Sequence, residues 1–427
     1  MTQIQNRSQP FLWGAATSAH QVEGDNRAND WWSWEETGRV KERSGQACDH
    51  WNRYKEDFEL AQKLGHNAHR FSLEWSRLEP KENQWDVNAF DHYAAVLRDL
   101  KERGIEPIVT LHHFTNPLWF QDYGGWLDER SIVYYLRYVR RAVSSFGEDV
   151  RFWITLNEPI VYLYHSYILG TWPPGRKSFQ DGLKVFRNLL LAHVRAYEII
   201  HENYERRQLP VWVSIAKHMA WLEPCRPHDF MDVAVTQMRQ WFLNDLMLKA
   251  ATSGFLLFPG LFCEFLPQAN SLDYIAVNYY TRHFVRWNQF SRLGLFGDMC
   301  MEEHHKPQMR SKNFFGWEIY AEGFYRSLRR LGAYQLPILV TENGICTDQD
   351  PERVRFIEDH LSVIRKLRHE GIPVNGYLYW SLLDNFEWDK GFGPRFGIIG
   401  VDYQNFQRKI KDSAYVLTQC CRNITGE

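Results

Sequence analysis

Two glutamates stand at the ends of short β-type runs that lie far apart in the chain. Glu158 belongs to the segment Thr-Leu-Asn-Glu-Pro, and Glu342 belongs to the segment Thr-Glu-Asn-Gly. Cleavage of a glycosidic bond requires two carboxyl groups that face each other across a sugar. The pair could perform this chemistry if the fold brings the two runs together.

Eight β-type runs recur along the chain, and segments with helical spacing of apolar residues separate them. A barrel of parallel strands would deliver every strand end to one face and so bring Glu158 and Glu342 together. The competing arrangement is an open doubly wound sheet, but the first turn lacks the GxGxxG pattern that often binds nucleotides there. The sequence therefore predicts a (β/α)8 barrel, a single domain over residues 1–427 with long loops after the strands. The predicted strands are Phe11–Ser18, Ala68–Glu74, Ile105–His112, Phe152–Asn157, Val211–Lys217, Asp273–Tyr279, Pro337–Thr341 and Val374–Trp380.

Between these runs the helical pattern is clear in five segments, and one region is irregular. Residues from about 281 to 317 are expected to form a long loop, in which His304 and His305 would be solvated. The predicted helices are Tyr54–Leu64, Phe90–Arg103, Ile132–Phe146, Leu183–Tyr204 and Pro351–Glu370.

Composition excludes several classes of partner. The net charge of −2 does not favour nucleic acid or an anionic membrane, because both usually require a basic face. No apolar run approaches the roughly 20 residues that span a bilayer. No metal-ligand spacing occurs among the seven cysteines, and the first residues contain no apolar signal segment, so free thiols, no metal and a cytoplasmic location are expected. The cysteines are Cys48, Cys225, Cys263, Cys300, Cys346, Cys420 and Cys421.

Seven of the eight predicted strands end in polar or aromatic residues able to bind a polyol, and together these ends form a set of ordered motifs. With them, the chain resembles glycoside hydrolase family 1, the β-glucosidase family, from Phe11 to about Tyr415. The motifs are Ser18–Gly24, Arg70–Ser72, Thr155–Pro159, Asn278–Thr281, Ile338–Gly344, Tyr379–Trp388 and Arg395–Ile398.

The resemblance implies roles for individual residues. Glu342 would be the nucleophile that forms a covalent glycosyl-enzyme, and Glu158 the acid/base, with their carboxyls about 5–5.5 Å apart as in retaining enzymes. The negative charge of Glu342 is expected to raise the pKa of Glu158. Arg70 and Tyr280 would hold Glu342 and keep it ionised. The residues expected to bind the sugar are Gln21, His113, Asn157, Tyr280, Trp380, Glu387, Trp388 and Phe396.

The family also implies a cofactor-free hydrolysis of small-molecule β-glycosides. Release of a terminal β-D-glucose is favoured, with β-galactosidase or β-fucosidase side activity. A 6-phospho-β-glucosidase and a catalytically silent sugar-binding barrel are the alternatives, and the carboxylate of Glu387 argues against a bound phosphate. Ile160 replaces the usual Trp after Asn-Glu-Pro, and His112–Thr115 replaces Tyr-His-Trp-Asp. These departures leave the leaving group open, and the oligomeric state is open too.

Overall fold

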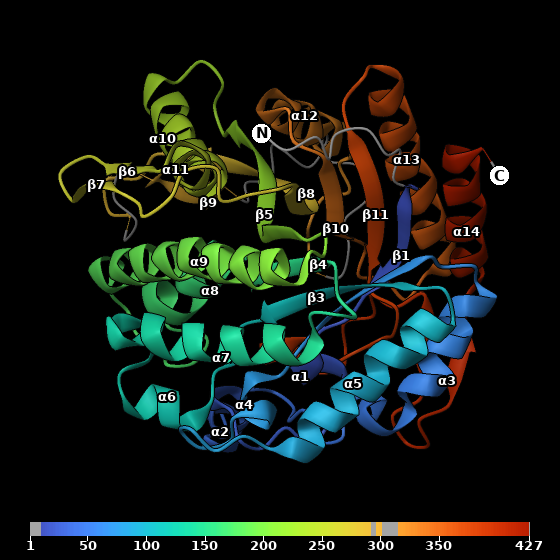
Figure 1. Ribbon diagram of the computed structural model, residues 1–427. Helices are drawn as coiled ribbons and strands as arrows, with labels where there is room; N and C mark the ends of the chain where they lie inside the picture. Colours follow the sequence, from blue (N-terminus) through green and yellow to red (C-terminus); the bar gives the residue numbers. More distant parts are fainter. Residues whose placement is uncertain (1–9, 292–295, 301–314, 427) are drawn as a thin grey trace.

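A closed barrel of parallel strands lies at the centre of the molecule, with helices around it (Figure 1). The computed structural model describes residues 10–291, 296–300 and 315–426. The barrel strands follow the order β10-β11-β1-β2-β3-β4-β5-β8, and pairing of β8 with β10 closes the ring. The predicted (β/α)8 fold is therefore confirmed. The barrel strands are β1 (Leu12–Ala16), β2 (Ala68–Ser72), β3 (Glu106–His112), β4 (Phe152–Asn157), β5 (Trp212–Pro224), β8 (Ile275–Arg286), β10 (Ile338–Asn343) and β11 (Val374–Trp380).

Apolar side chains fill the inside of the barrel, away from the strand ends that carry polar residues. On β4, Phe152 and Ile154 belong to this cluster, as alternate residues of a strand that point the same way. Packed layers of this kind make the barrel a core rather than a pore, so a site can form only at one end. The cluster consists of Leu12, Ala68, Ile108, Phe152, Ile154, Ala216, Tyr274, Ala276, Leu339 and Leu378.

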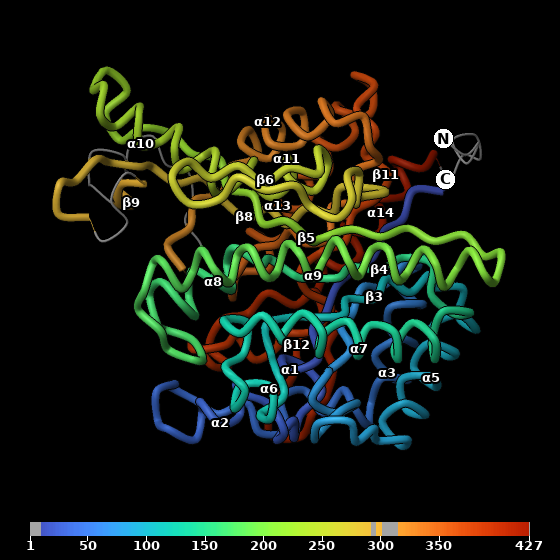
Figure 2. The backbone as a smooth tube through the Cα atoms, turned by 60° about the vertical axis from the view of Figure 1, so that its left-hand side comes forward, coloured from blue at the N-terminus to red at the C-terminus, as the bar shows by residue number. Residues whose placement is uncertain are grey.

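All five predicted helices occur, with ends that differ from the prediction by a few residues. Their local signals are physical: Asp86, for example, accepts hydrogen bonds from the backbone of Asn88 and Ala89 and so caps the helix α5. α7 and α9 lie side by side on the outside of the barrel in both views (Figures 1 and 2). Of the helices described, none is long and apolar enough to cross a membrane. The longer helices are α3 (His50–Lys63), α5 (Val87–Glu102), α7 (Arg130–Phe146), α9 (Phe179–Arg207), α10 (Phe230–Gln240), α11 (Leu246–Ser253), α12 (Ala321–Leu331), α13 (Asp350–His369) and α14 (Asp412–Thr425).

Short elements complete the loops between the strands and helices. β6 pairs antiparallel with β7, and β12 pairs antiparallel with β13. They are α1 (Ala19–Val22), α2 (Asp30–Glu36), α4 (Trp75–Leu78), α6 (Leu118–Asp122), α8 (Pro159–Leu163), η1 (Gly125–Leu127), the π-helices η2 (Tyr164–Leu169) and η3 (Trp241–Asp245), η6 (Gly332–Tyr334), η7 (Trp388–Lys390), β6 (Phe255–Phe258), β7 (Phe262–Phe265), β12 (Ile399–Val401) and β13 (Arg408–Ile410).

Two barrel strands extend beyond the barrel, where the sequence predicted a loop. β5 and β8 remain paired as far as Pro224 and Val285, and β9 (Asp298–Cys300) pairs antiparallel with β8. This extension and α10 lie at one edge of the molecule (Figure 2). The predicted loop over 281–317 is thus wrong where β8 and β9 run. Residues 292–295 and 301–314, with His304 and His305, lie outside the described residues.

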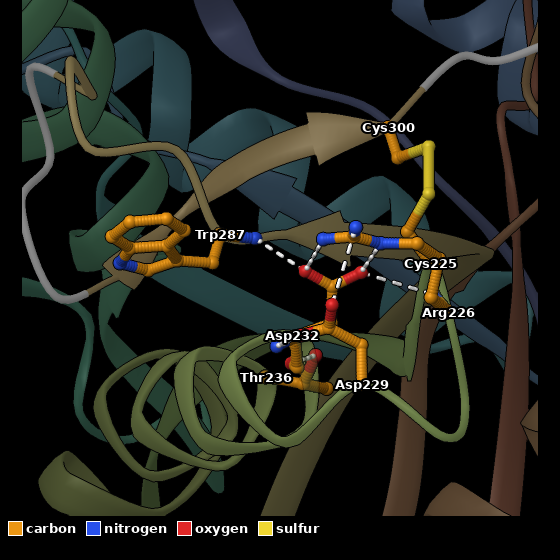
Figure 3. Close-up of a disulfide and its surroundings, with 7 residues drawn as sticks. All are labelled: Cys225, Arg226, Asp229, Asp232, Thr236, Trp287 and Cys300. Carbon is orange, nitrogen blue, oxygen red and sulfur yellow. Dashed lines mark hydrogen bonds and ion pairs between the residues drawn. A yellow bond between two sulfur atoms is a disulfide. The ribbon is translucent and has the colours of Figure 1, made fainter.

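The extension also contains a disulfide that the sequence did not predict. Cys225 follows β5, Cys300 lies on β9, and a bond joins their sulfur atoms across β8 (Figure 3). The prediction that all seven cysteines are free thiols is therefore wrong. Pairing of β9 with β8 places Cys300 opposite Phe284, and the N–H of Cys225 donates to the carbonyl oxygen of Val285, which brings the two cysteines together.

Candidate active site

A cavity of about 520 Å³ lies at the end of the barrel where the parallel strands finish. Ten of the eleven predicted site residues line it, although they come from segments spread over most of the chain. Only Arg70 does not reach the cavity surface, because it is fully buried on β2 beneath it. The ten are Gln21, His113, Asn157, Glu158, Tyr280, Glu342, Trp380, Glu387, Trp388 and Phe396.

Glu158 is presented by a sharp turn between β4 and α8. Its backbone has a φ of +42°, in the left-handed region that few residues other than glycine adopt, and Pro159 begins α8 immediately after it. The side chain is buried, and Asn278 Nδ2 donates a hydrogen bond of 2.8 Å to Glu158 Oε1. His218 Nδ1 lies 3.4 Å from the same oxygen. Backbone strain of this kind is common at functional sites.

Glu342 lies at the end of β10 and is held by two donors. Arg70 Nη1 donates to Glu342 Oε1 at 2.5 Å, and the hydroxyl of Tyr280 donates to Glu342 Oε2 at 2.6 Å. The turn after it needs Gly344, because a Cβ there would lie 1.9 Å from the carbonyl oxygen of Trp380. Both carboxylate oxygens of Glu342 therefore have fixed positions at the cavity floor.

Arg70 connects Glu342 to the neighbouring strand ends. Its Nη2 donates to Asn157 Oδ1 at 2.7 Å, and its Nε donates to the hydroxyl of Thr110 at 3.0 Å. The amide of Asn157 in turn lies 3.1 Å from His113 Nε2. A guanidinium keeps its charge in a buried site and fixes several acceptors at once, so this network pre-organises the site before any ligand binds.

The opposite wall combines a carboxyl group with flat aromatic rings. Gln21 Nε2 donates to the carbonyl oxygen of Phe386 at 2.9 Å and to Glu387 Oε2 at 3.2 Å. Burial raises the pKa of Glu387 to about 8, and the charge of Glu342 adds to this effect. The ring of Trp380 lies nearly parallel to His113, with ring centres 6.0 Å apart. Apolar faces beside polar tips are what a sugar ring requires.

The electrostatics of the two central carboxyls differ from the sequence expectation. Burial has the largest effect on each and raises both pKa values. For Glu342 it prevails over the opposing Arg70 and Tyr280, and the charge of Glu158 adds to it, so the pKa reaches about 7. For Glu158, the effects of His218 and then of the Asn278 hydrogen bond outweigh burial and lower the pKa. Of the two carboxyls, Glu342 therefore has the higher pKa.

Comparison with known proteins agrees with this geometry. Residues 5–258 and 262–424 match the family model described as Glycosyl hydrolase family 1. The chain belongs to this family. It is therefore a glycoside hydrolase.

Alignments with curated relatives and with solved structures cover nearly the whole of this chain. Beta-glucosidase A of Thermotoga maritima is 33% identical, and the alignment covers 97% of each chain. The solved beta-glycosidase from Pyrococcus horikoshii is 40% identical with a TM-score of 0.90, covering 97% of this chain and 94% of that one. The Thermotoga maritima beta-glucosidase in complex with deoxynojirimycin is 31% identical with a TM-score of 0.86, covering 97% and 98%.

In this family 1 chain the sequence also missed residues that line the cavity beside Glu158. Lys217 and His218 lie on β5, the strand whose predicted end at Lys217 fell short of the true one. The signal was present, because Lys217 and His218 are two adjacent basic residues between the apolar pairs Ile215–Ala216 and Met219–Ala220 of β5.

The residues that depart from the family motifs do not all reach the cavity. Ile160 and Phe114 line the cavity, whereas His112 turns to Asn116, 3.0 Å away. Among the described residues no group of metal-ligating side chains occurs.

Proposed function

We propose that this family 1 glycoside hydrolase is a retaining exo-β-glycosidase that releases a terminal non-reducing β-D-glucose from disaccharides or small glycosides. One observation carries the proposal: Glu158 and Glu342 line the same cavity with different partners. Glu342 accepts hydrogen bonds from Arg70 and Tyr280, which favour the ionised form. Glu158 has no arginine beside it in ion-pair contact among the described residues: it accepts a hydrogen bond from the neutral amide of Asn278, and His218 Nδ1 lies 3.4 Å away. The surroundings thus suit one carboxylate nucleophile and one acid.

In the first step Glu342 attacks the anomeric carbon of the bound sugar. The bond from that carbon to the leaving oxygen breaks, the leaving oxygen takes the proton of Glu158, and an ester to Glu342 forms. Positive charge develops on the sugar ring in the transition state, and an ionised Glu342 stabilises it.

In the second step water replaces the leaving group. Glu158, now ionised, removes a proton from water as the oxygen attacks the anomeric carbon, and the bond to Glu342 breaks. The sugar leaves with its original anomeric configuration, because the carbon has been attacked twice. The ester at Glu342 is uncharged, so the pKa of Glu158 falls and Glu158 stays ionised until it takes the proton from water.

The active enzyme holds one proton on the carboxyl pair. Burial raises the pKa of Glu342 to about 7, which favours the proton on Glu342 before the reaction begins. The reaction needs it on Glu158, and positive charge on the sugar favours this arrangement because it stabilises an ionised Glu342. Activity should therefore fall at low pH, where both carboxyls are protonated, and at high pH, where neither is.

The other cavity residues have proposed roles in binding the released sugar. Trp380 would form the floor under its apolar face, and Phe396 would close an apolar wall. Gln21, Glu387 and His113 would bind its hydroxyls. The remaining two are Asn157, for the hydroxyl beside the reacting carbon, and Trp388.

The assay that tests this function compares four aryl glycosides: β-glucoside, β-galactoside, β-fucoside and 6-phospho-β-glucoside. We expect the β-glucoside to have the highest kcat/KM. A 6-phospho-β-glucosidase would instead hydrolyse the 6-phospho-β-glucoside fastest. The structure does not favour this outcome, because Lys390, the cation nearest Glu387 in sequence, already pairs with Asp389 at 2.5 Å. The absence of any hydrolysis would instead support a silent sugar-binding barrel.

A single domain over residues 1–427 and a cytoplasmic location also remain proposals. The Cys225–Cys300 disulfide counts against a strictly reducing compartment. Titration of thiols in the denatured, unreduced protein distinguishes the two cases. The structure predicts five reactive thiols, whereas a fully reduced chain would give all seven.

A further inference from the structure

The side of the cavity beyond Glu158 carries basic side chains that the proposed reaction does not use. Lys217, His218, Arg239 and His283 line this side, which would receive the leaving group. They come from β5, α10 and the outer part of β8. The released sugar would lie on the other side.

Arg239 is a buried cation without a carboxylate partner among the described residues. Its side chain is almost fully covered, with an exposed fraction of 2%. Nη1 donates to the carbonyl oxygens of Gly297 at 3.2 Å and Phe296 at 3.4 Å. A guanidinium has five N–H donors, so donors remain for a ligand. A buried charge without an opposite charge is costly, and an anionic ligand would offset that cost.

Lys217 is a second buried basic group on the same wall, and a bound anion would favour its charged form. Its exposed fraction is 1%, and Nζ donates to the carbonyl oxygens of His218, at 2.5 Å, and of Leu243. An ammonium has three donors, so one is left over. Burial lowers the pKa of Lys217 to about 7, and the charges of Glu158 and Asp245 oppose this effect only in part. No carboxylate lies within ion-pair distance of Nζ in the described part of the chain.

The acidic groups near this wall have other partners or must carry a proton. The charge of Asp298 acts on Arg239, but its oxygens accept hydrogen bonds from Asn288 at 2.7 Å and Ser291 at 2.6 Å. Asp389 accepts a hydrogen bond from Trp172 Nε1 at 3.0 Å and pairs with Lys390 at 2.5 Å. Glu158 must carry a proton when it acts as the acid and is then neutral. Arg239, and Lys217 in its protonated form, therefore remain available to an anionic ligand.

The extension of β5, β8 and β9 holds Arg239 in place. Asp232, earlier on the same helix, forms two hydrogen bonds with the guanidinium of Arg226, of 2.8 and 2.9 Å. Figure 3 shows this clamp beside the Cys225–Cys300 disulfide, which anchors β9 directly after the carbonyls that Arg239 contacts. The cation is thus fixed by the surrounding fold.

We propose that the leaving group of the natural substrate carries an anionic group, a carboxylate or a phosphate, which Arg239 and Lys217 bind. The proposal rests on the proposed glucosidase function and specifies its substrate class. The anionic group belongs to the leaving group and not to the released sugar, because the sugar side of the cavity contains the carboxyl groups of Glu342 and Glu387, which would repel an anion.

The test compares three β-D-glucosides that differ only in the group on the phenol ring: carboxylate, phosphate and neutral carboxamide. The ratio of kcat/KM for each anionic glucoside to that for the carboxamide is measured in the wild type and in Arg239→Met. Because intrinsic leaving-group reactivity is the same for both enzymes, it cancels in this comparison. Arg206→Met, on the exposed end of α9, is the matched control.

We expect Arg239→Met to lower the ratio for at least one anion by roughly tenfold to a hundredfold, the usual effect of a hydrogen bond to a charged group. Arg206→Met should leave it unchanged. The anionic glucoside whose ratio falls more shows whether the natural leaving group carries a carboxylate or a phosphate. Lys217→Met and inhibition of the wild type by benzoate against benzamide give the same information if Arg239→Met does not fold.

An unchanged ratio in both cavity variants, with benzoate and benzamide inhibiting equally, would overturn the anionic leaving group and leave the glucosidase function intact. If the wild type hydrolysed none of the three glucosides, the proposed function itself would be wrong, and this proposal with it.

Discussion

The two sides of the cavity are built in different ways. On the sugar side, Glu342, Asn157 and His113 lie on the ends of barrel strands and are linked through Arg70 into one hydrogen-bonded network. On the leaving-group side, Lys217 lies on β5 and Arg239 on α10, and both donate hydrogen bonds to backbone carbonyl oxygens. The sugar side is thus pre-organised by its own hydrogen bonds, whereas the leaving-group side keeps N–H donors that no residue in the described part of the chain uses.

This difference shows which part of the site is tied to chemistry and which to substrate choice. Loss of a group in the linked network should affect every glycoside, because that network positions the reacting carboxyls. Loss of Lys217 or Arg239 on the leaving-group side should lower the rate only for glycosides with certain leaving groups. Four variants test this division, from the largest expected effect to the smallest.

Replacement of Glu342 should have the largest effect, on the sugar side. Glu342→Ala removes the proposed nucleophile, and we expect hydrolysis of an aryl β-D-glucoside to fall on the order of 10⁴-fold or more. Initial rates measure the loss, with Glu322→Ala on the surface of α12 as the control. Activity within about tenfold of the wild type would exclude Glu342 as the nucleophile.

Replacement of Glu158 should depend on the leaving group. Glu158→Ala removes the acid, so kcat/KM for cellobiose should fall by about 10² to 10⁴. An aryl glucoside with a strongly acidic phenol should lose far less, because its leaving oxygen needs no proton. Steady-state kinetics on both substrates measure the two losses, and equal losses would contradict the acid role.

Tyr280→Phe should have a smaller effect, of roughly tenfold to a hundredfold on kcat, since one hydrogen bond to a charged group is lost. The hydroxyl of Tyr280 opposes the rise in the pKa of Glu342, so without it that pKa rises further. Because Glu342 has the higher pKa of the pair in the free enzyme, the basic limb of the kcat/KM profile should move to higher pH. Tyr325→Phe, where the hydroxyl bonds Glu370 on the surface, should leave the profile in place. A shift to lower pH would refute the proposed role of the hydroxyl.

His218→Asn should have the smallest effect, at the boundary between the two sides. His218 holds the pKa of Glu158 down, so its removal should raise that pKa. Because Glu158 has the lower pKa of the pair in the free enzyme, the acid limb of kcat/KM should move up by roughly 0.5 to 1 pH unit. The exposed His228→Asn is the control. If the acid limb stayed in place, His218 would have no effect on the pKa of Glu158.

The sugar side could be predicted from the sequence because its residues lie in short motifs at strand ends. Once the barrel was inferred, the ends of β4 and β10 had to meet, so Glu158 and Glu342 could be paired without knowing any other contact. Arg70 followed from the family resemblance.

The leaving-group side could not be predicted, because long-range pairing creates it. The segment after Tyr280 seemed to be a loop, since its charged residues resemble those of an exposed segment. In the structure Arg282 is buried against Glu318, with Nε 2.5 Å from the carboxylate, and stacks on Tyr320. The same distant contacts bring Cys225 to Cys300. The inverted pKa order of the central carboxyls depends on His218, which local patterns also did not reveal.

Trapping the covalent intermediate tests the central claim most directly. The enzyme would be incubated with a 2-deoxy-2-fluoro-β-D-glucoside that has an activated leaving group, digested, and analysed by mass spectrometry. The account predicts time-dependent inactivation with one fluorosugar on the peptide that contains Glu342, and no label in Glu342→Ala. A label on Glu158, or turnover without any covalent species, would contradict it.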